Sequence, residues 1–482
     1  MFVGTGSDVG KSILTAGFCR IFLQDGYQPA PFKSQNMSLN SYVTDNGGEI
    51  GRAQAVQAEA CRLKCSTDMN PVLLKPSSDK TSQVILHGKV LGNYPAGSYF
   101  NGDLKQQLFG EAMKAFERLA HNHCPVVMEG AGSISELNLK QNDIANMRVA
   151  MATNASTFLI ADIERGGVFG SIYGSVELLE PEERERIKGI FINKFRGDIT
   201  LFDEGRKIIE KLTGIPVLGV IPSFNHIRIE AEDSVSLERK ATFADDHKIN
   251  VAVILLHRLS NFTDFDCLER DERVHLFYSN NKEEIRKADI IIIPGSKNTI
   301  SDLIELRRNG VAAEISQLAR QGKSVIGICG GYQMMGRRVE DPYHTESEVE
   351  SIPGLGILPV TTIMAKEKET RQISFYFKDN PEVCTGYEIH MGRTIAEGNA
   401  GYVNTTSGDQ KEGCLLNENV WGTYMHGILD NPIVINDILK PFTNNSGQSI
   451  NYEEFKQLEY DKLAKHLRDN VDMDKFYKII SE

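Results

Sequence analysis

The chain opens with a glycine-rich segment that could bind phosphate. Gly4, Gly10, Lys11 and Ser12 lie in MFVGTGSDVGKS, and ILTAGFCRIFL follows as a helical pattern. A strand, a tight turn and a helix present backbone N–H groups to an anion at the positive end of the helix. Lys11 would contact the terminal phosphates, and the Ser12 hydroxyl would bind Mg²⁺. The loop is one residue longer than G-x-x-x-x-G-K-[ST] when counted from Gly4, so we predict a variant nucleotide-binding loop. A glycine-rich turn with an exposed lysine is the alternative.

Two glutamates are candidate Mg²⁺ ligands. Glu129 in EGAGS follows the apolar run Val126 to Met128, and Glu49 precedes a helical pattern in GGEIGRAQAVQAEA. Ligands of α/β proteins bind at the carboxyl ends of parallel strands, and Mg²⁺ prefers oxygen ligands. For Glu49 we give equal weight to a solvated turn.

A reactive cysteine is indicated in SVIGICGGYQMMG, Ser324 to Gly336. Cys329 ends an apolar strand pattern between Gly327 and Gly331. Small residues on both sides permit the tight strand-to-helix elbow that exposes a nucleophile. The helix N-terminus lowers the pKa of a thiol and supplies N–H groups for an oxyanion. We predict that Cys329 is a nucleophile; the alternative is a buried structural cysteine.

A nucleophilic cysteine needs a base. His426 in WGTYMHGILD, again after a short apolar run, is the first candidate. His390 in GYEIHMGR is a rival, and His344 in PYHTE is a weaker third.

The elements that must position these residues alternate between short apolar runs and longer helical patterns, which predicts a parallel α/β fold. The expected buried strands are Val126 to Met128, Thr157 to Ala161, Gly189 to Asn193, Val217 to Ile221, and runs within INVAVILL, VHLFY, ADIIIIPGS, SVIGICGG and WGTYMHG. A polar stretch from Ser234 to Lys248 separates two domains. We place the domains at 1–236 and 249–445, and a C-terminal helical segment at 446–482.

Composition narrows the class of protein. The chain has 482 residues, which favours two or three domains. Its net charge of -12 argues against nucleic acid as the main partner. The apolar runs are too short to cross a membrane, and the start of the chain lacks a signal-peptide pattern. Eight scattered cysteines indicate no disulfide framework, so we expect a cytoplasmic protein. The sequence leaves open whether it forms a homo-oligomer.

Several strings, in order along nearly the whole chain, resemble the cobyric acid synthase family. They are GTGSDVGKS, KSQNMSLNS, GEIGRAQAVQAEA, MNPVLLKPSSD, EGAGS, DIANM, DIERGGVFG and INKFRGD. The variant loop also resembles that of dethiobiotin synthetase, and the Cys329 segment resembles class I glutamine amidotransferases. The resemblance implies an N-terminal P-loop-type parallel-sheet domain and a C-terminal class I glutamine amidotransferase domain. It also implies ATP- and glutamine-dependent amidation of peripheral carboxylates of adenosylcobyrinic acid a,c-diamide, with Mg²⁺.

The resemblance implies further site residues. Lys33 in KSQN would contact phosphate or the reaction intermediate, and Asn193 in INKF matches a position that contacts adenine. Asp162 and Arg165 in ADIERGG are substrate candidates. Arg165 could pair with a substrate carboxylate, with a structural salt bridge weighted equally.

The resemblance also places the P-G-S turn of IIPGSKNTI beside the nucleophile. The backbone N–H groups of Gly295 in this turn, and of Gly330 after Cys329, are candidates for the oxyanion hole.

One position departs from most class I amidotransferases. They carry a carboxylate two residues after the histidine, where this chain has Ile428, with Asp430 two residues further on. The group that orients His426 therefore stays unassigned, and we expect a slower, more regulated glutaminase.

Three other functions are weighed. Cobyrinic acid a,c-diamide synthase shares both domain types, but KSQNMSLNS and GEIGRAQAVQAEA favour the first interpretation. A ParA/MinD-like ATPase switch would leave Cys329 and His426 without a task. A cysteine hydrolase with a vestigial nucleotide domain would not depend on ATP.

Overall fold

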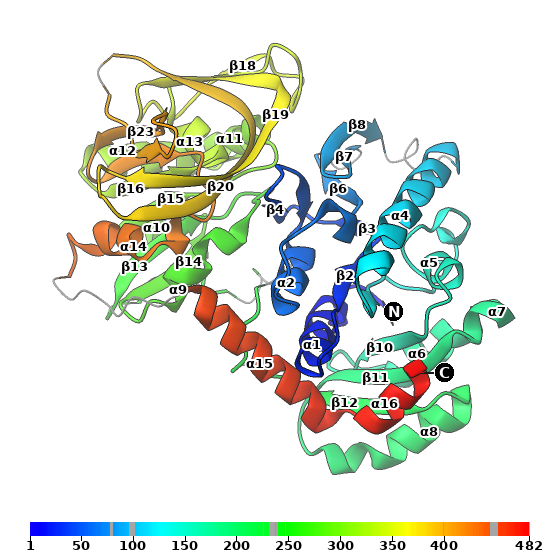
Figure 1. Ribbon diagram of the computed structural model, residues 1–482. Helices are drawn as coiled ribbons and strands as arrows, with labels where there is room; N and C mark the ends of the chain where they lie inside the picture. The colour runs from blue at the N-terminus through cyan, green and yellow to red at the C-terminus, as the bar shows by residue number, and fades with distance from the viewer. Residues whose placement is uncertain are drawn as a thin grey trace.

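The computed structural model consists of two α/β domains and a pair of C-terminal helices (Figure 1). It describes residues 1–77, 81–95, 102–224, 226–230, 237, 240–245, 247–398, 400–443 and 452–481. We use "N-terminal domain" for β1 to β12 and "C-terminal domain" for β13 to α14. The predicted domain limits at 236, 445 and 446 lie outside the described residues. Within the described ranges, no helix is long and apolar enough to cross a membrane.

A parallel sheet forms the centre of the N-terminal domain, as predicted. Its main part has the order β1-β10-β11-β12, and β2 pairs with β9 beside it. A parallel bridge between Phe2 and Glu129 connects the two parts. The strands are β1 (Phe2–Gly4), β2 (Ala30–Phe32), β9 (Val126–Met128), β10 (Thr157–Asp162), β11 (Ile187–Phe195) and β12 (Val217–Pro222). They are mostly buried, as expected of parallel strands covered on both faces.

Helices and two small sheets surround this parallel sheet. The helices are α1 (Lys11–Gln24), α2 (Arg52–Ala60), α4 (Gly102–Asn122), α5 (Met147–Ala152), α6 (Val168–Glu177), α7 (Pro181–Arg184) and α8 (Asp203–Thr213). One small sheet has the order β3-β6-β7-β8, from β3 (Gln35–Met37), β6 (Val72–Pro76), β7 (Thr81–Leu86) and β8 (Lys89–Pro95). The other is an antiparallel hairpin of β4 (Ser41–Val43) and β5 (Glu49–Gly51).

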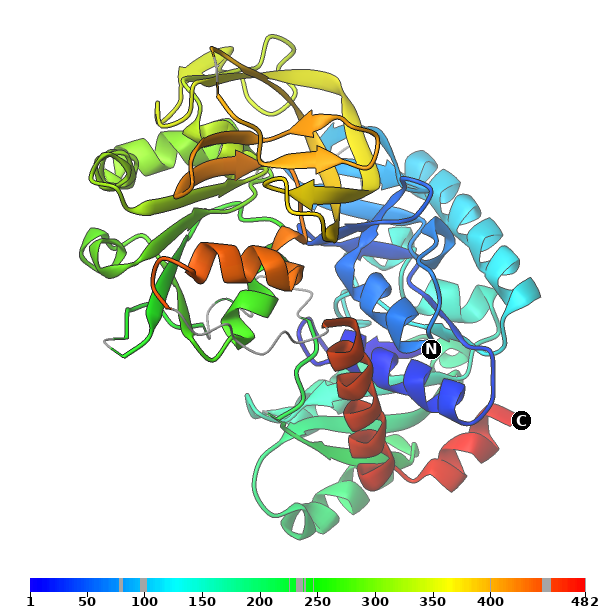
Figure 2. The same ribbon diagram turned by 60° about the vertical axis from the view of Figure 1, so that its left-hand side comes forward.

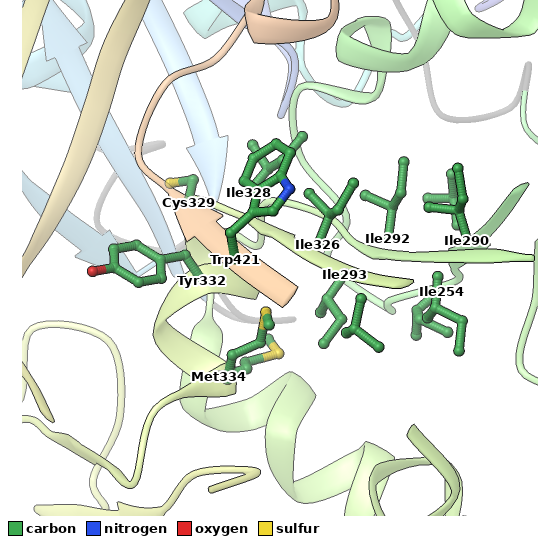
Figure 3. Packing of buried hydrophobic residues seen from close by; sticks show 14 of the residues in the cluster. Ile254, Ile290, Ile292, Ile293, Ile326, Ile328, Cys329, Tyr332, Met334 and Trp421 are labelled. Atoms are coloured by element: carbon green, nitrogen blue, oxygen red, sulfur yellow. The ribbon is translucent and has the colours of Figure 1, made fainter. Parts of the chain in front are cut away.

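The C-terminal domain contains the second predicted sheet, with the order β14-β13-β15-β16-β24-β23. Its strands are β13 (Ile249–Ile254), β14 (Val274–Ser279), β15 (Ile290–Ile293), β16 (Ser324–Ile328), β23 (Cys414–Asn417) and β24 (Val420–Thr423), and only β23 is antiparallel to its neighbour. Isoleucines from β13, β15 and β16 pack with Trp421 in its core, and Cys329 lies at the end of this row (Figure 3). The helices are α9 (Asp266–Arg270), α10 (Lys282–Lys287), α11 (Thr299–Arg308), α12 (Val311–Arg320), α13 (Gly330–Met335) and α14 (Pro432–Leu439).

A further sheet in the C-terminal domain was not predicted. It consists of β17 (Arg338–Glu340), β18 (Ser351–Pro353), β19 (Val360–Phe377), β20 (Val383–Ala396), β21 (Asn404–Thr406) and β22 (Lys411–Glu412). β19 and β20 form a long antiparallel ribbon with partly exposed, polar faces. Such strands lack the continuous apolar run by which buried parallel strands are recognised.

The C-terminal helices α15 (Tyr452–Asn470) and α16 (Met473–Ser481) return to the N-terminal domain (Figure 2). Leu463 and Leu467 of α15 lie against Gly17 of α1, where a Cβ on the glycine would be 2.3 Å from Leu467 Cδ1. The rings of Phe18 and Phe476 are 4.7 Å apart. The end of the chain therefore completes the core of its first domain.

Candidate functional sites

The glycine-rich loop connects β1 to α1 and closes against β11. Gly10 caps α1 with φ 97°, a conformation that favours glycine. The Asn193 Nδ2 donates to the Val9 carbonyl at 2.9 Å, and a Cβ on Gly10 would lie 2.1 Å from that nitrogen. The conformation and the close approach both account for glycine at this position.

Ser12, Lys33 and Glu129 meet at the start of α1. The Ser12 hydroxyl donates to Glu129 Oε1 at 2.7 Å, and Lys33 Nζ approaches the same oxygen at 2.9 Å. Gln57 Nε2 donates to Glu129 Oε2 at 2.6 Å. A hydroxyl and a carboxylate held together are suitable Mg²⁺ ligands beside bound phosphates. The residues present therefore fit a magnesium-nucleotide site.

Lys11 lies on the same loop. Its Nζ donates to the carbonyls of Gly6, at 2.8 Å, and Gly132, at 3.0 Å. The ammonium group is thus held over the loop, where it can neutralise a phosphate.

The two substrate candidates lie close to the loop. Asp162 pairs with Lys194 at 3.0 Å, and Arg165 pairs with Asp8 of the loop at 3.5 Å. The Arg165 side chain is 69% exposed, so its guanidinium is accessible to a substrate carboxylate.

Cys329 occupies a strained elbow between β16 and α13. Its φ of 51° and ψ of -108° are unusual for a residue with a side chain. A Cβ on Gly331 would lie 1.9 Å from the Ile293 carbonyl oxygen, and one on Gly330 would lie 2.7 Å from the Ser296 nitrogen. The glycines allow the elbow to pack directly against the P-G-S turn after β15, so Gly295 and Gly330 lie on facing segments.

His426, the first candidate for the base, lies beside this thiol. Its Nδ1 is 2.6 Å from Asp264 Oδ2, and the backbone N–H of Gly427 donates to Asp264 Oδ1 at 3.0 Å. With Nδ1 bound to the carboxylate, Nε2 faces the thiol. Burial lowers the pKa of His426, but the Asp264 carboxylate and the Cys329 sulfur outweigh it and raise that pKa to about 10. This arrangement favours a protonated imidazolium beside the Cys329 sulfur.

Of the two rival histidines, His390 lines the same cavity as Cys329 and His426, but its ring nitrogen and its ring face have other partners. His390 Nδ1 is 2.9 Å from the Gly392 carbonyl, and its ring stacks on Tyr424 at 3.7 Å. Burial lowers the pKa of His390 to about 4, so it stays neutral. His344 lies in an exposed turn beside the Ser347 carbonyl.

Comparison with known proteins identifies both domains. Residues 1–237 match the CobQ/CobB/MinD/ParA nucleotide binding domain, and residues 250–433 match the CobB/CobQ-like glutamine amidotransferase domain. The cobyric acid synthase of Bacteroides fragilis is 58% identical over 485 residues, which cover 100% of this chain and 98% of that protein. The chain belongs to the cobyric acid synthase family. The cobyric acid synthases of Parabacteroides distasonis, at 58% identity, and Phocaeicola vulgatus, at 55%, match over the same shares of both chains.

Asp264, which holds the His426 ring, was not among the predicted site residues. It lies in η5 (Phe262–Phe265), after β13, and is 162 residues from His426. FTDFD gives no local signal for an aspartate that orients a histidine, because the pairing depends on β13 and β24 belonging to one sheet.

Glu49 does not join the Ser12–Glu129 cluster, so the structure agrees with neither of the two expectations for it, a Mg²⁺ ligand or a residue of a solvated turn. Both of its carboxylate oxygens are occupied by lysines: Oε1 by Lys75 at 2.7 Å, and Oε2 by Lys368 of β19. Glu49 is 1% exposed. Burial would raise its pKa, but the two lysines hold it well below its usual range. The helix predicted after Glu49 is confirmed as α2, but the direction of the Glu49 side chain depends on Lys368 of the second domain.

Proposed function

We propose that the chain amidates peripheral carboxylates of adenosylcobyrinic acid a,c-diamide, with ATP and glutamine, to give adenosylcobyric acid. The observation that carries this proposal is that one member of the cobyric acid synthase family holds both the Ser12–Glu129 cluster and the Cys329–His426–Asp264 arrangement. The first suits phosphoryl transfer, and the second suits release of ammonia from an amide.

The N-terminal domain would activate the acid. Hydroxide is a poor leaving group, so a carboxylate does not react with ammonia directly. A substrate carboxylate oxygen attacks the γ-phosphorus of ATP, ADP leaves, and the product is an acyl phosphate. Lys11 and Lys33 would balance the phosphate charge. Ser12 and Glu129 would hold Mg²⁺, which when bound neutralises charge on the phosphates.

The C-terminal domain would supply ammonia. The Cys329 thiolate attacks the side-chain amide carbon of glutamine, and His426 gives its proton to the departing nitrogen. Ammonia leaves and a glutamyl thioester remains, which water hydrolyses with His426 as base. The N–H groups of Gly295 and Gly330 are the proposed donors to the oxyanion. Ammonia then attacks the acyl phosphate and phosphate leaves.

Three residues complete the proposed substrate sites. Asn193, which packs against the loop, is assigned to the adenine end of the nucleotide. Asp162 and Arg165 are assigned to the corrinoid.

Four carboxylates at different positions of the corrinoid must be amidated, so we propose that the substrate leaves and rebinds between rounds. A time course should therefore contain partly amidated corrinoids in solution; their absence would contradict release between rounds.

A product assay with Cys329→Ala tests the division of labour. We expect glutamine-driven amidation to fall by at least about 1,000-fold, because the nucleophile is lost. Ammonia-driven amidation should stay within about twofold of wild type, because the N-terminal site is intact. Cys384→Ala, at a buried cysteine of β20, is the matched control and should keep both activities. Equal loss with both nitrogen sources would contradict separate sites.

A further inference from the structure

The hairpin of β4 and β5 belongs to the N-terminal domain but packs on the C-terminal domain. The Thr370 hydroxyl donates to the Gly47 carbonyl at 2.7 Å, and Gln372 Nε2 donates to the Val43 carbonyl. Val43 forms a small apolar cluster with Tyr387 and Ile389 of β20. In Figure 1, β4 lies between the two domains, beside β20.

This contact reaches the thiol site. The Tyr387 ring stacks on His426 with centroids 5.3 Å apart, and their backbones exchange hydrogen bonds of 3.0 and 2.9 Å. The Tyr387 hydroxyl donates to the Ser41 carbonyl at 3.3 Å. The Cys329 sulfur in turn lies 3.7 Å from the Ile389 carbonyl oxygen. Both catalytic side chains are therefore held by a strand that the hairpin supports.

Buried charges join the same elements. Lys75 lines the cavity beside Cys329, together with Lys368 of the C-terminal domain. Glu49 lies between these two lysines, and Lys75 also donates to the Ser41 hydroxyl at 2.7 Å. Removing one partner from such a group leaves a buried charge uncompensated, so the three side chains keep one arrangement.

The chain leads directly from this cluster to the nucleotide site. After Gly51 it enters α2, and Gln57 of α2 donates to Glu129 at 2.6 Å and to the Ser12 carbonyl at 3.3 Å. The six residues from Arg52 to Gln57 of α2 span about 9 Å, because a helix rises about 1.5 Å per residue. The Oε1 atom of Gln57 and the Nε2 atom of Gln54 are buried without a hydrogen-bond partner in the described part of the chain.

We propose that Glu49 and Lys75 of the N-terminal domain are positioning residues of the glutaminase site. Through helix α2, the reactivity of the Cys329 thiol then depends on whether the nucleotide site is occupied. Magnesium-nucleotide binding competes with Gln57 for the Glu129 carboxylate. Any resulting shift of α2 moves Glu49, and with it the hairpin under Tyr387 and His426. A ligand can shift such an equilibrium only through different contacts in the two states, and Gln57 supplies that difference. This inference rests on the proposed function.

The test compares Glu49→Gln with Asp45→Asn. Asp45 lies between β4 and β5, and its side chain is 57% exposed and pairs with exposed Lys64, so this control makes the same chemical change in the hairpin without touching the Glu49–Lys75–Lys368 cluster. The readout is the rate at which iodoacetamide alkylates Cys329, followed by mass spectrometry with and without Mg²⁺ and a non-hydrolysable ATP analogue. We expect the analogue to raise this rate at least threefold in wild type and Asp45→Asn, and to leave it unchanged in Glu49→Gln.

Turnover gives a second readout. Glu49→Gln should consume several glutamines for each amide formed, against about one in wild type, and should keep ammonia-driven amidation within about twofold. If Glu49→Gln loses ammonia-driven amidation as well, the same alkylation measurement is made on Lys368→Met. This variant removes the Glu49–Lys368 ion pair by a change in the C-terminal domain and leaves the N-terminal domain unaltered. Unchanged alkylation ratios in both variants, or no nucleotide effect in wild type, would overturn the inference. Failure of the proposed function looks different, since wild type would then form no amide with either nitrogen source.

Discussion

At the scale of single residues, Asp264 supplies what the neighbourhood of His426 lacks. Most class I amidotransferases place a carboxylate two residues after the histidine, where this chain has Ile428. Asp264 approaches from another segment and contacts both the His426 ring and the Gly427 amide. The expectation of a slower, more regulated glutaminase was based on His426 having no assigned partner, and it stays a prediction. Because Asp264 orients and charges the His426 ring, a slow turnover of glutamine would have to come from regulation of the site and not from a missing carboxylate.

Replacing Asp264 by Asn should expose this role. The amide can still hydrogen-bond to the ring but no longer stabilises an imidazolium, so the pKa of His426 should fall from about 10. We expect glutaminase kcat to fall by about 100-fold or more. The alkaline limb of its pH profile should move to lower pH, because His426 loses its proton sooner. Ammonia-driven amidation serves as the control, and a wild-type pH profile would contradict the role.

At the scale of elements, the nucleophile elbow depends on three packed segments. β16 and α13 meet at Cys329, and the turn after β15 fills the space that side chains at Gly330 and Gly331 would need. The elbow stores strain at one residue, and the surrounding sheet maintains it.

Gly331→Ala should break this packing. The new Cβ would lie 1.9 Å from the Ile293 carbonyl oxygen, so the elbow must move. We expect a loss of about 3 kcal/mol in the free energy of unfolding of the C-terminal domain, measured by urea denaturation, and loss of glutamine-driven amidation. Gly408→Ala adds a methyl group whose nearest neighbour is 3.9 Å away, and it should leave both quantities unchanged. Equal stability of the two variants would contradict close packing at the elbow.

At the scale of the whole molecule, helix α15 ties the two domains together. Arg52 at the start of α2 donates to Glu230 at 2.6 Å, and the Tyr452 hydroxyl of α15 donates to the same carboxylate at 2.7 Å. Arg270 of the C-terminal domain lies over the Tyr452 ring. One buried carboxylate thus holds together the end of the N-terminal domain, the C-terminal helix and, through Tyr452, the second domain.

This junction should be sensitive to acid. Burial raises the pKa of Glu230, but Arg52 and Lys456 outweigh burial and lower it to about 2, from 4.5 in the unfolded chain. A lowered pKa contributes stability that is present above pH 4.5 and is lost as the pH falls towards 2. Glu230→Gln should therefore cost about 3 to 5 kcal/mol at pH 7, and its difference from wild type should shrink below pH 4.5. Urea denaturation across this pH range measures it.

A glutamate on the same junction gives the control. Glu453 of α15 is 66% exposed, and Glu453→Gln should change the free energy of unfolding by less than about 0.5 kcal/mol at any of these pH values. A pH-independent cost for Glu230→Gln would show that packing, and not the ion pair, stabilises the junction.

The sequence by itself determined the features whose causes are local. Glycines around Lys11 and Cys329 are required by backbone conformation and by close approach, and apolar runs reveal buried parallel strands. Ser12 and Glu129 could be paired from the sequence because both follow strands of the same parallel sheet, whose carboxyl ends meet at one edge.

The tertiary structure decided what depends on contacts between distant segments. Asp264 and His426, 162 residues apart along the chain, meet because the strands that precede them, β13 and β24, belong to one sheet, and nothing in either segment encodes the other. Glu49 was a candidate metal ligand in the sequence, but in the structure it is ion-paired because Lys368 approaches it from the other domain. The ribbon of β19 and β20 escaped prediction because its faces are partly solvated. Local patterns specify elements, whereas the free energy of a buried charge depends on which partner the whole fold brings to it.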